Sequence, residues 1–447
     1  MKLNKMKMHP LIILENIMAS FIFIFALGLA FLTELIIEKE LNNFLNFNII
    51  IIFIIFIGII SFLALLSWHH THIYIDNFFH IETGKLLKKH IKININDIAA
   101  ISTKKNILER IFNVSSVKVE LNTGVDDTIN QKIILKDSYI EKINKIVLGK
   151  HELKKNSLVS YSNIDIFNHL FLSSNILSII LGIIITFGIL FYLIEEGNNI
   201  FVILITGIII FLGYVWNFVK KYFDYHNFNL SQEDNKIKIS YGLFSKRTFE
   251  IPKEKINAII ISQSLQARIF NKYVINIVNA GIGNEEDEKT ILCLYSSKEN
   301  IDELIKKLFP DFLYEGKKIN QTPQALTVYL INKMPFIFIV ATLCLWYSKM
   351  LLLIDLIFII IAIIQYKTKS LELDKKLIIS KTGLFNKKVT IIKYSKITKV
   401  DFVDTLIGGL YHIKYLKIST VGAIGEHIFK LGYYSSRIEN KIINSLK

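Results

Sequence analysis

The chain carries the same residue pattern three times, from Gly84 to Gly124, from Gly242 to Gly281 and from Gly383 to Gly422. In each copy a Leu or Phe lies two residues after the first glycine, and a dibasic pair follows. An aliphatic–aromatic pair later precedes alternating apolar residues, which are typical of a β-strand. A repeat of about 150 residues is too long for a solenoid unit, so the pattern predicts three duplicated domains.

Each copy closes with the signature of an amphipathic helix. A serine lies three residues before a glutamate, so that each side chain can accept a hydrogen bond from a backbone N–H at the helix start. Apolar residues follow at helical spacing. The pairs are Ser138 with Glu141, Ser296 with Glu299, and Ser436 with Glu439. We therefore expect each repeat to be a group of strands closed by one helix.

Two apolar blocks precede each repeat, and the chain is 52% hydrophobic with a mean hydropathy of +0.42. A helix of about 20 apolar residues crosses a hydrocarbon core of about 30 Å. The blocks span residues 17–37 and 48–67, 171–194 and 200–219, and 328–346 and 350–365. They predict an α+β membrane protein with three transmembrane helical hairpins, six helices in all. Each hairpin is followed by a small β-barrel or sandwich with a C-terminal helix.

Charges beside the blocks predict the orientation. Three lysines and no acidic residue lie in residues 1–9, so the first block is predicted to be a retained anchor. The hairpin tips at Glu38–Glu40 and Glu195–Glu196 are poor in Lys and Arg. By the positive-inside tendency, both termini and all three domains are predicted to be cytoplasmic. Lys349, at the third tip, weakly opposes this orientation, and the third pair of blocks is also interrupted by Lys333 and Asp355.

These features divide the chain into six segments. The hairpins, with the N-terminus or a linker, occupy residues 1–67, 151–219 and 313–366, and the domains occupy residues 68–150, 220–312 and 367–447.

The dibasic pairs are the leading candidates for a binding site. They are Lys88–Lys89, Lys246–Arg247 and Lys387–Lys388. Each pair follows a turn glycine, where ammonium and guanidinium groups can bind anionic lipid headgroups or a partner protein. The chain has a formal charge of +15, and residues 366–447 hold 16 Lys or Arg against 6 Asp or Glu. The alternative is that these side chains guard an exposed strand edge against aggregation.

Four histidines near the end of the second block suggest a metal site. They are His69, His70, His72 and His80. No carboxylate or thiol is arranged with them in the sequence, so an interfacial cluster at the membrane boundary is favoured over a metal site. No metal or cofactor is predicted.

Two further sets of residues have structural and functional interpretations. Arg110 and Arg268 occupy the same offset in two copies, and we expect their guanidinium groups to hold loop carbonyls. Glu15, predicted at the membrane interface, and Asp355 could belong to an ion pathway. The two cysteines, Cys293 and Cys344, are interpreted as small core residues.

The sequence contains no GxxxxGK, HExxH, GxSxG or paired CxxC motif, which favours a protein that is not an enzyme. Nucleic-acid binding is disfavoured because the basic residues are tied to a bilayer and most aromatic residues lie in the apolar blocks.

The middle copy resembles the bacterial PH-like membrane domain of the YdbS and YdbT type. The resemblance rests on GLFSKR, IPKEKI, the run SLQARIF at 264–270 and Asn279-Ala280-Gly281. Three copies, with His9-Pro10 before the first block, resemble the YdbT arrangement over nearly the whole chain. The first copy lacks the proline corresponding to Pro252, and the third has Gly409 in place of the arginine. The resemblance implies a bacterial plasma-membrane protein with cytoplasmic PH-like domains and no catalytic residues.

Two functional hypotheses follow. The first is a non-enzymatic multi-pass scaffold that binds partner proteins or anionic lipid. The resemblance suggests a smaller PH-like membrane protein as its partner, and the six helices could also assemble a homo-oligomer. The alternative is a component of membrane transport or export, or of resistance to toxic peptides, supported only by Glu15 and Asp355. Neutral replacement of these two carboxylates separates the hypotheses.

Overall fold

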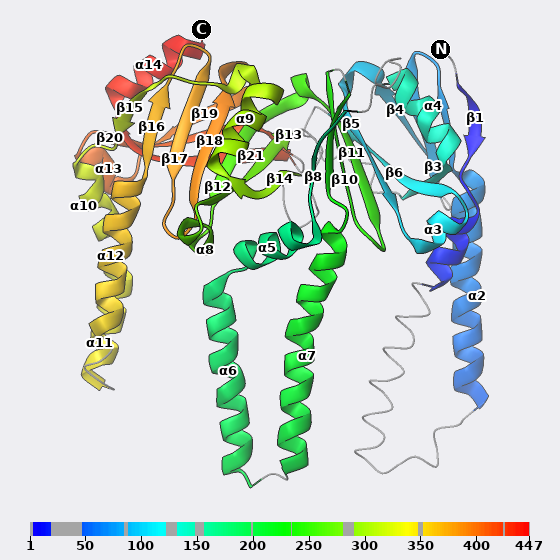
Figure 1. The fold of residues 1–447 in the computed structure, drawn as a ribbon, viewed down its shortest axis with the longest axis horizontal. Helices are drawn as coiled ribbons and strands as arrows, with labels where there is room; N and C mark the ends of the chain where they lie inside the picture. The colour runs from blue at the N-terminus through cyan, green and yellow to red at the C-terminus, as the bar shows by residue number, and fades with distance from the viewer. Residues whose placement is uncertain are drawn as a thin grey trace. The chain divides into compact units, whose positions relative to one another are not determined.

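The computed structural model describes residues 3–18, 47–84, 88–121, 132–147, 156–197, 200–233, 235–279, 290–346, 352–422 and 425–446. The chain divides into two compact units, Met1–Val119 with Ile129–Glu152 and Glu120–Thr128 with Leu153–Lys447 (Figure 1). The first unit holds most of the first repeat, and the second unit holds the other two repeats.

The first repeat follows an apolar helix. Its elements are β1 (Leu3–Lys7), α2 (Phe47–His70), β2 (His72–Ile75), β3 (Phe78–Gly84), β4 (Lys88–Asn94), β5 (Ile98–Lys105), α3 (Ile107–Ile111), β6 (Val114–Leu121), β7 (Ile133–Lys136) and α4 (Asp137–Val147). The first four strands form an antiparallel sheet in the order β1-β2-β3-β4.

The second repeat has the same order of elements around two long apolar helices. They are β8 (Asn156–Ser160), α5 (Asn163–Ser173), α6 (Ile176–Glu195), α7 (Ile200–Tyr225), β9 (Asn229–Glu233), β10 (Lys236–Tyr241), β11 (Lys246–Pro252), β12 (Ile256–Gln263), α8 (Leu265–Ile269), β13 (Lys272–Asn279), β14 (Thr290–Ser297) and α9 (Lys298–Leu308). The strand β10 shows why these segments pair. Ile237, Ile239 and Tyr241 are buried, whereas the residues between them are partly exposed, as expected for a strand with one face on the core.

The third repeat completes the second unit. Its elements are β15 (Lys317–Asn320), α10 (Gln324–Ile331), α11 (Met334–Trp346), α12 (Leu352–Thr368), β16 (Ser370–Leu373), β17 (Leu377–Thr382), β18 (Lys387–Lys393), β19 (Ile397–Val403), α13 (Leu406–Leu410), β20 (Ile413–Gly422), β21 (Gly425–Ser435) and α14 (Ser436–Leu446).

In every repeat, a strand that precedes the apolar helices pairs with the first strand that follows them. The pairs are β1 with β2, β8 with β9, and β15 with β16. The segments 1–67, 151–219 and 313–366, which the sequence analysis assigned to hairpins and linkers, therefore each contribute a strand to the domain that follows. These strands are short and polar, as in Lys317–Asn320 (KKIN), and so they lack the alternation by which a strand is predicted.

The second and third repeats share one seven-stranded sheet, in the order β14-β13-β12-β18-β17-β16-β15. The strands β12 and β18 join them in antiparallel register, with Ala258 opposite Ile392 and Gln263 opposite Lys387. The hydrophobic core crosses the same boundary, because Ala258 and Ile260 of the second repeat pack in one buried cluster with Leu416 of the third. These two repeats are therefore not independent domains.

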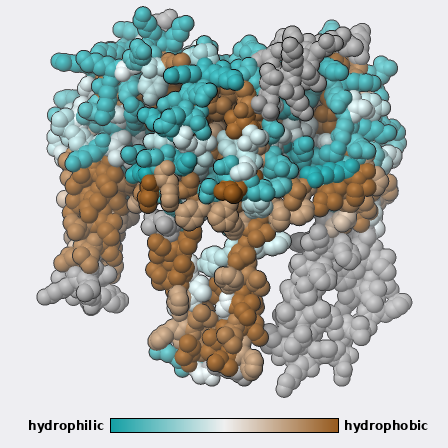
Figure 2. All heavy atoms as spheres, viewed as in Figure 1, coloured by the Kyte–Doolittle hydropathy of each residue, from teal (hydrophilic) through white to brown (hydrophobic). Residues whose placement is uncertain are grey.

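Within the described residues, two helices are long and apolar enough to cross a membrane, over Ser178–Glu195 and Ile203–Tyr225. A third candidate is the pair Gln324–Ile331 and Met334–Leu343, which bends by 43°. Figure 2 shows apolar residues gathered over α6 and α7 and hydrophilic residues over the sheets of the same unit. The described structure thus supports two or three of the six predicted spans. Most of the first block, residues 17–37, lies outside it.

The helices that close the repeats begin close to the predicted positions. The N-cap of α9 is Ser297, which accepts a hydrogen bond from Asn300 N at 3.4 Å. The predicted cap, Ser296, is wrong by one residue because β14 continues through Ser297. Ser138 lies inside α4, which begins at Asp137, and Ser436 is the first residue of α14.

Candidate functional site

The three dibasic pairs occupy the same structural position. Each forms the first two residues of the second strand in a β-hairpin, at the start of β4, β11 and β18. In the second unit we call residues 242–247 and 383–388 the basic tips. The side chain of Lys88 lies outside the described part of the structure, as does the turn at 85–87 that precedes it.

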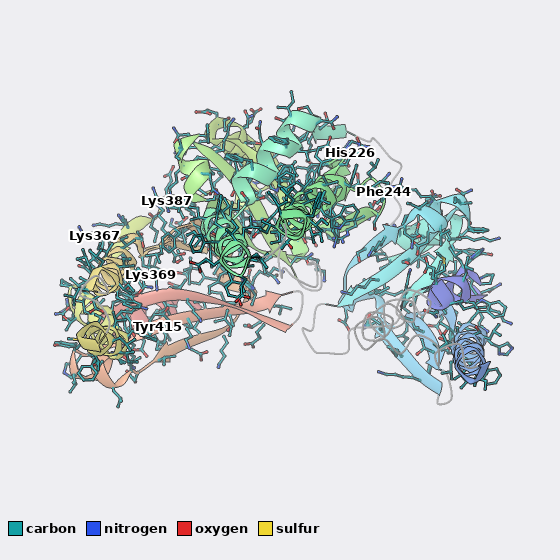
Figure 3. The ribbon with its side chains drawn as sticks, turned by 90° about the horizontal axis from the view of Figure 1, so that it is seen from below. His226, Phe244, Lys367, Lys369, Lys387 and Tyr415 are labelled. Carbon is teal, nitrogen blue, oxygen red and sulfur yellow. The ribbon has the colours of Figure 1, made fainter. Side chains whose placement is uncertain are left out.

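The basic tip at 242–247 is attached to the end of α7. Gly242 N donates to His226 O at 2.7 Å, and Leu243 N donates to Phe223 O at 2.9 Å. The rings of Phe244 and Phe223 also contact, with centroids 4.7 Å apart. Figure 3 labels His226 and Phe244 at this end of the helix. This tip therefore lies where the second candidate span ends.

The turn in this tip requires glycine. Gly242 has φ +110°, and a Cβ atom there would lie 2.1 Å from Ser245 O. An L-residue would be strained by its backbone conformation and would also clash with the backbone of the turn.

The basic tip at 383–388 lies at the end of α12. Ser370, two residues beyond α12, pairs with Lys381, and the tip follows directly after β17. Lys387 and Lys388 are both exposed. In the other tip Lys246 is exposed, but Arg247 is partly buried and its side chain is hydrogen-bonded to Tyr241. Burial raises the pKa of Tyr241, and the charge and hydrogen bond of Arg247 partly oppose this rise. Lys387 and Lys388 are thus the pair most open to an anionic partner.

A short apolar helix lies beside this tip. Lys388 is opposite Ser262 and Lys387 is opposite Gln263 across the β12·β18 pair, and α8 begins two residues later. At the end of α8, Ile269 is 78% exposed and Phe270 is 57% exposed. Basic and apolar side chains therefore occur next to each other at one end of the shared sheet.

The helix α8 is attached to the residues that lead into the span α6. Ser264 Oγ donates to Leu172 O at 2.6 Å, and Gln266 Nε2 donates to Ser174 O at 2.9 Å. Ile176, the first residue of α6, follows two residues later. In Figure 1, α5 and α8 lie where α6 leaves the sheets. The helix α5 also exposes one apolar face, formed by Ile164, Phe167 and Phe171.

The same short helix occurs in every repeat as α3, α8 and α13, and we call these helices, with the aromatic residue that follows each, the apolar corners. Their N-caps are Asn106, Ser264 and Thr405. The exposed residues are Ile107, Ile111 and Phe112 in the first, Ile269 and Phe270 in the second, and Leu406, Leu410 and Tyr411 in the third. The repeated aliphatic–aromatic pair was visible in the sequence, but its position on an exposed helix was not.

A lysine that the sequence analysis missed lies just beyond α12. Lys369 Nζ donates to Tyr329 Oη at 3.2 Å and to Tyr415 Oη at 3.3 Å, and it lies over both rings. Burial lowers the pKa of Lys369 to about 8. Figure 3 labels Lys369 and Tyr415, with Lys367 nearby.

The four histidines do not converge on a metal site. His80 Nε2 lies 3.0 Å from Asp76 Oδ1, and His80 Nδ1 lies 3.1 Å from His90 Nε2. His70 Nδ1 instead lies 2.9 Å from the carbonyl of Leu66. Among the described residues, no group of three or more His, Cys, Asp or Glu side chains could hold a metal ion. Asp76 was not predicted as a partner of these histidines, and its contact with His80 is a feature that the structure adds.

The predicted role of Arg268 is not observed. Its Nε and Nη2 atoms are buried and have no hydrogen-bond partner among the described residues, so the structure does not show this guanidinium group holding loop carbonyls. Cys293 is a buried core residue as predicted, and its Sγ lies 2.8 Å from Tyr161 Oη. The side chain of Cys344 lies outside the described part.

The two carboxylates of the transport hypothesis have different environments. Glu15 accepts a hydrogen bond from Asn106 Nδ2 at 2.7 Å and forms an ion pair with Lys132. This contact connects the segment before the first block to the apolar corner of the first repeat. Asp355 is 8% exposed in the first turn of α12, and its Oδ1 has no hydrogen-bond partner in the described part.

The sequence profile of the bacterial PH domain family matches residues 21–148, 167–309 and 325–443, and the chain belongs to this family. It is similar to the UPF0699 transmembrane protein YdbT of Bacillus subtilis (strain 168), with 23% identity over 439 residues, which cover 86% of this chain and 88% of the relative. These findings confirm the YdbT-like arrangement of three PH-like repeats. No solved structure matches the chain.

Proposed function

We propose that the protein is a non-enzymatic, multi-pass membrane scaffold whose PH-like domains lie on the surface of the bacterial plasma membrane. Three helical hairpins anchor it, and the domains and both termini are cytoplasmic. The basic tips bind anionic lipid headgroups, and the domains bind partner proteins. The observation that supports this function best is the position of Lys387 and Lys388, exposed beside an apolar corner and at the end of α12.

The membrane anchor is supported by helices in the second unit and by the name of the relative. The helices α6 and α7 are 20 and 26 residues long, and α11 and α12 contact each other as a shorter pair. The relative from Bacillus subtilis is described as a transmembrane protein. The helix α2, with 24 residues, is long enough for one span of the first hairpin, since a helix rises 1.5 Å per residue.

Lipid contact is supported by the combination of charge and apolar surface. Each basic residue close to an anionic membrane surface contributes about 1 kcal/mol of attraction. Apolar residues at the same level can enter the boundary between headgroups and acyl chains, as amphipathic helices do. The face of α5 and the apolar corners α8 and α13 provide such residues, and Gln266 of α8 is hydrogen-bonded to Ser174, two residues before α6.

Native mass spectrometry of the full-length protein, released from nanodiscs of mixed phosphatidylcholine and phosphatidylglycerol, tests the lipid contact. We expect the protein to retain phosphatidylglycerol preferentially at low salt, and less so at high salt. Replacing Lys387 and Lys388 by Ala should reduce the preference. The matched control replaces the exposed Lys317 and Lys318, which lie farther from the spans on β15. A preference unchanged in both variants would refute lipid binding by the tips.

The transport hypothesis is favoured by one observation: among the described residues, the buried Oδ1 of Asp355 has no hydrogen-bond partner. Glu15 is already engaged in holding the first repeat together. If the protein is a scaffold, Asp355→Asn should leave its phenotype and its capture of partners unchanged. A loss of an export or resistance phenotype, with normal protein levels in the membrane, would favour transport.

A further inference from the structure

The β12·β18 pair shows how two PH-like repeats can be joined into one sheet. The last three strands of the second repeat and the first four strands of the third form one sheet through the β12·β18 pair. The repeat pattern makes β19 the equivalent of β12 and β4 the equivalent of β18. Among the described residues, β19 pairs only with β20, and β4 pairs only with β3. In the described part of the chain, both halves of this joint are therefore open strand edges.

We propose that β19 of one copy pairs with β4 of a second copy, which assembles the protein head to tail in the membrane. An open edge presents unpaired backbone N–H and C=O groups, which readily accept another strand. The β12·β18 register then predicts the contacts. Val403 lies opposite Lys89, as Ser262 lies opposite Lys388, and Asp401 lies opposite Ile91.

Charge complementarity favours a second copy as the occupant. Lys89 and Lys92 are exposed on β4, and its N-terminal end is basic. Asp401 is partly exposed on β19, and Asp404 follows the strand. In the predicted register Asp401 is diagonal to Lys89, which is within reach of a long side chain. Lys399, paired with Asp401 at 3.0 Å, limits indiscriminate pairing at this edge, as charges on edge strands generally do.

A β19·β4 pair allows both copies to lie in the same membrane. In the β12·β18 template the end of β12 lies beside the basic tip of the next repeat, and the helices α6, α7, α11 and α12 leave the second unit on the same side (Figure 1). A β19·β4 pair with the same geometry would place the spans of both copies on one side of the joined sheet. Because each copy has one edge of each kind, the contact is heterologous and can repeat along a row of copies. The inference rests on the proposed membrane anchor but not on lipid binding by the basic tips.

Disulfide crosslinking in native membranes tests this register. Two differently tagged full-length chains are coexpressed, one with Val403→Cys and the other with Lys89→Cys, both with Cys293 and Cys344 replaced. We expect a disulfide between the two tags, because opposed residues in a strand pair meet the Cα spacing of a disulfide. Lys399→Cys is the matched control on the same strand. It would lie four residues out of register with Lys89, about 13 Å away along the strand, and should not crosslink.

A single chain with Ser262→Cys and Lys388→Cys provides the positive control, because these residues are opposite each other in the structure. If this intrachain disulfide forms and the Val403–Lys89 disulfide does not, the proposal is overturned. A chain that carries both Val403→Cys and Lys89→Cys should give a ladder of oligomers. A product of monomer size would show that the chain closes on itself and would overturn assembly with a second copy.

Exchanging the charges at Asp401 and Lys89 distinguishes a specific contact between the two strands from a general effect on folding. Asp401→Lys should lower the yield of the Val403–Lys89 disulfide about threefold to tenfold, since like charges near each other across strands are destabilising. Lys89→Asp removes the cysteine position, so here association of the two chains is read by co-purification of their two tags. Restoration of co-purification by Lys89→Asp is the expected result, and failure of restoration would contradict the proposed contact.

Discussion

Lys387 lies opposite Gln263 across the β12·β18 pair, which places the basic tip of the third repeat beside the apolar corner of the second. Neither group on its own would indicate contact with a membrane surface. A lysine at an exposed hairpin is usually a solvated edge residue, and a single exposed isoleucine is common on protein surfaces. Their combination, next to residues that lead into α6, is the feature that points to the boundary between headgroups and acyl chains.

The shared core predicts that the second and third repeats unfold together. Ile260 is 2% exposed and packs with residues of the third repeat. Ile260→Ala should lower the free energy of unfolding by about 2–4 kcal/mol and should increase hydrogen exchange in β20 and β21 as well as in β12. Both can be measured in detergent or nanodiscs. Ile428→Ala, at a residue that is 51% exposed, is the matched control and should have little effect. Faster exchange confined to the second repeat would contradict a common core.

Gly242→Ala should strain the basic tip at α7. The positive φ and the close approach to Ser245 O predict a loss of about 1–3 kcal/mol, together with faster hydrogen exchange at Gly242 N and Leu243 N, which are bonded to α7. Gly409→Ala is the control, because a Cβ atom there meets nothing within 4 Å among the described atoms. Equal behaviour of the two variants would show that the tip is not held as described.

Lys369 predicts a specific dependence of stability on pH. Its pKa is about 8 in the folded protein, below the ordinary value of 10.5, so between these values the unfolded chain binds more protons than the folded one. The contribution of Lys369 to the free energy of unfolding should therefore rise as pH increases from about 8 to 10.5. Below pH 8 the cost of burying the charged amine is fully present. The difference in unfolding free energy between the native protein and Lys369→Met measures this effect.

We expect Lys369→Met to be the more stable protein near pH 7 and to lose that advantage at high pH. Lys367→Met, at an exposed residue in the last turn of α12, should show no such change. A difference between native protein and Lys369→Met that does not vary with pH would show that the amine is not buried as described.

Much of the fold followed from the sequence, for reasons that particular residues illustrate. The repeated glycine and dibasic pair predicted equivalent hairpins because a turn glycine fixes where a strand begins, and the structure confirms that Lys88, Lys246 and Lys387 each open a strand. The apolar blocks predicted α6 and α7 because long apolar helices have a simple compositional signature.

Other features have no comparable signature. The β12·β18 pair joins segments far apart in the chain, and such pairing depends on which sheet edges meet in three dimensions rather than on local pattern. The strand β15 is too short and polar to be recognised. The corner α8 is a five-residue helix, which is shorter than the spacing needed to display helical periodicity. Lys369 follows an apolar block, and only the packing of Tyr329 and Tyr415 reveals that it is partly buried.

The most direct test of the membrane-surface scaffold is the depth of the apolar corners in the bilayer. Single spin labels are placed at Leu410 and at Ile428 in full-length protein in nanodiscs, with the two natural cysteines replaced. Ile428 pairs with Ser419, about 20 Å along β20 from its start near α13. If the apolar corner enters the bilayer, the label at 410 should be more accessible to oxygen than to a water-soluble nickel complex, and the label at 428 should show the reverse. A label at 410 as accessible to the nickel complex as the label at 428 would contradict contact between the domains and the membrane.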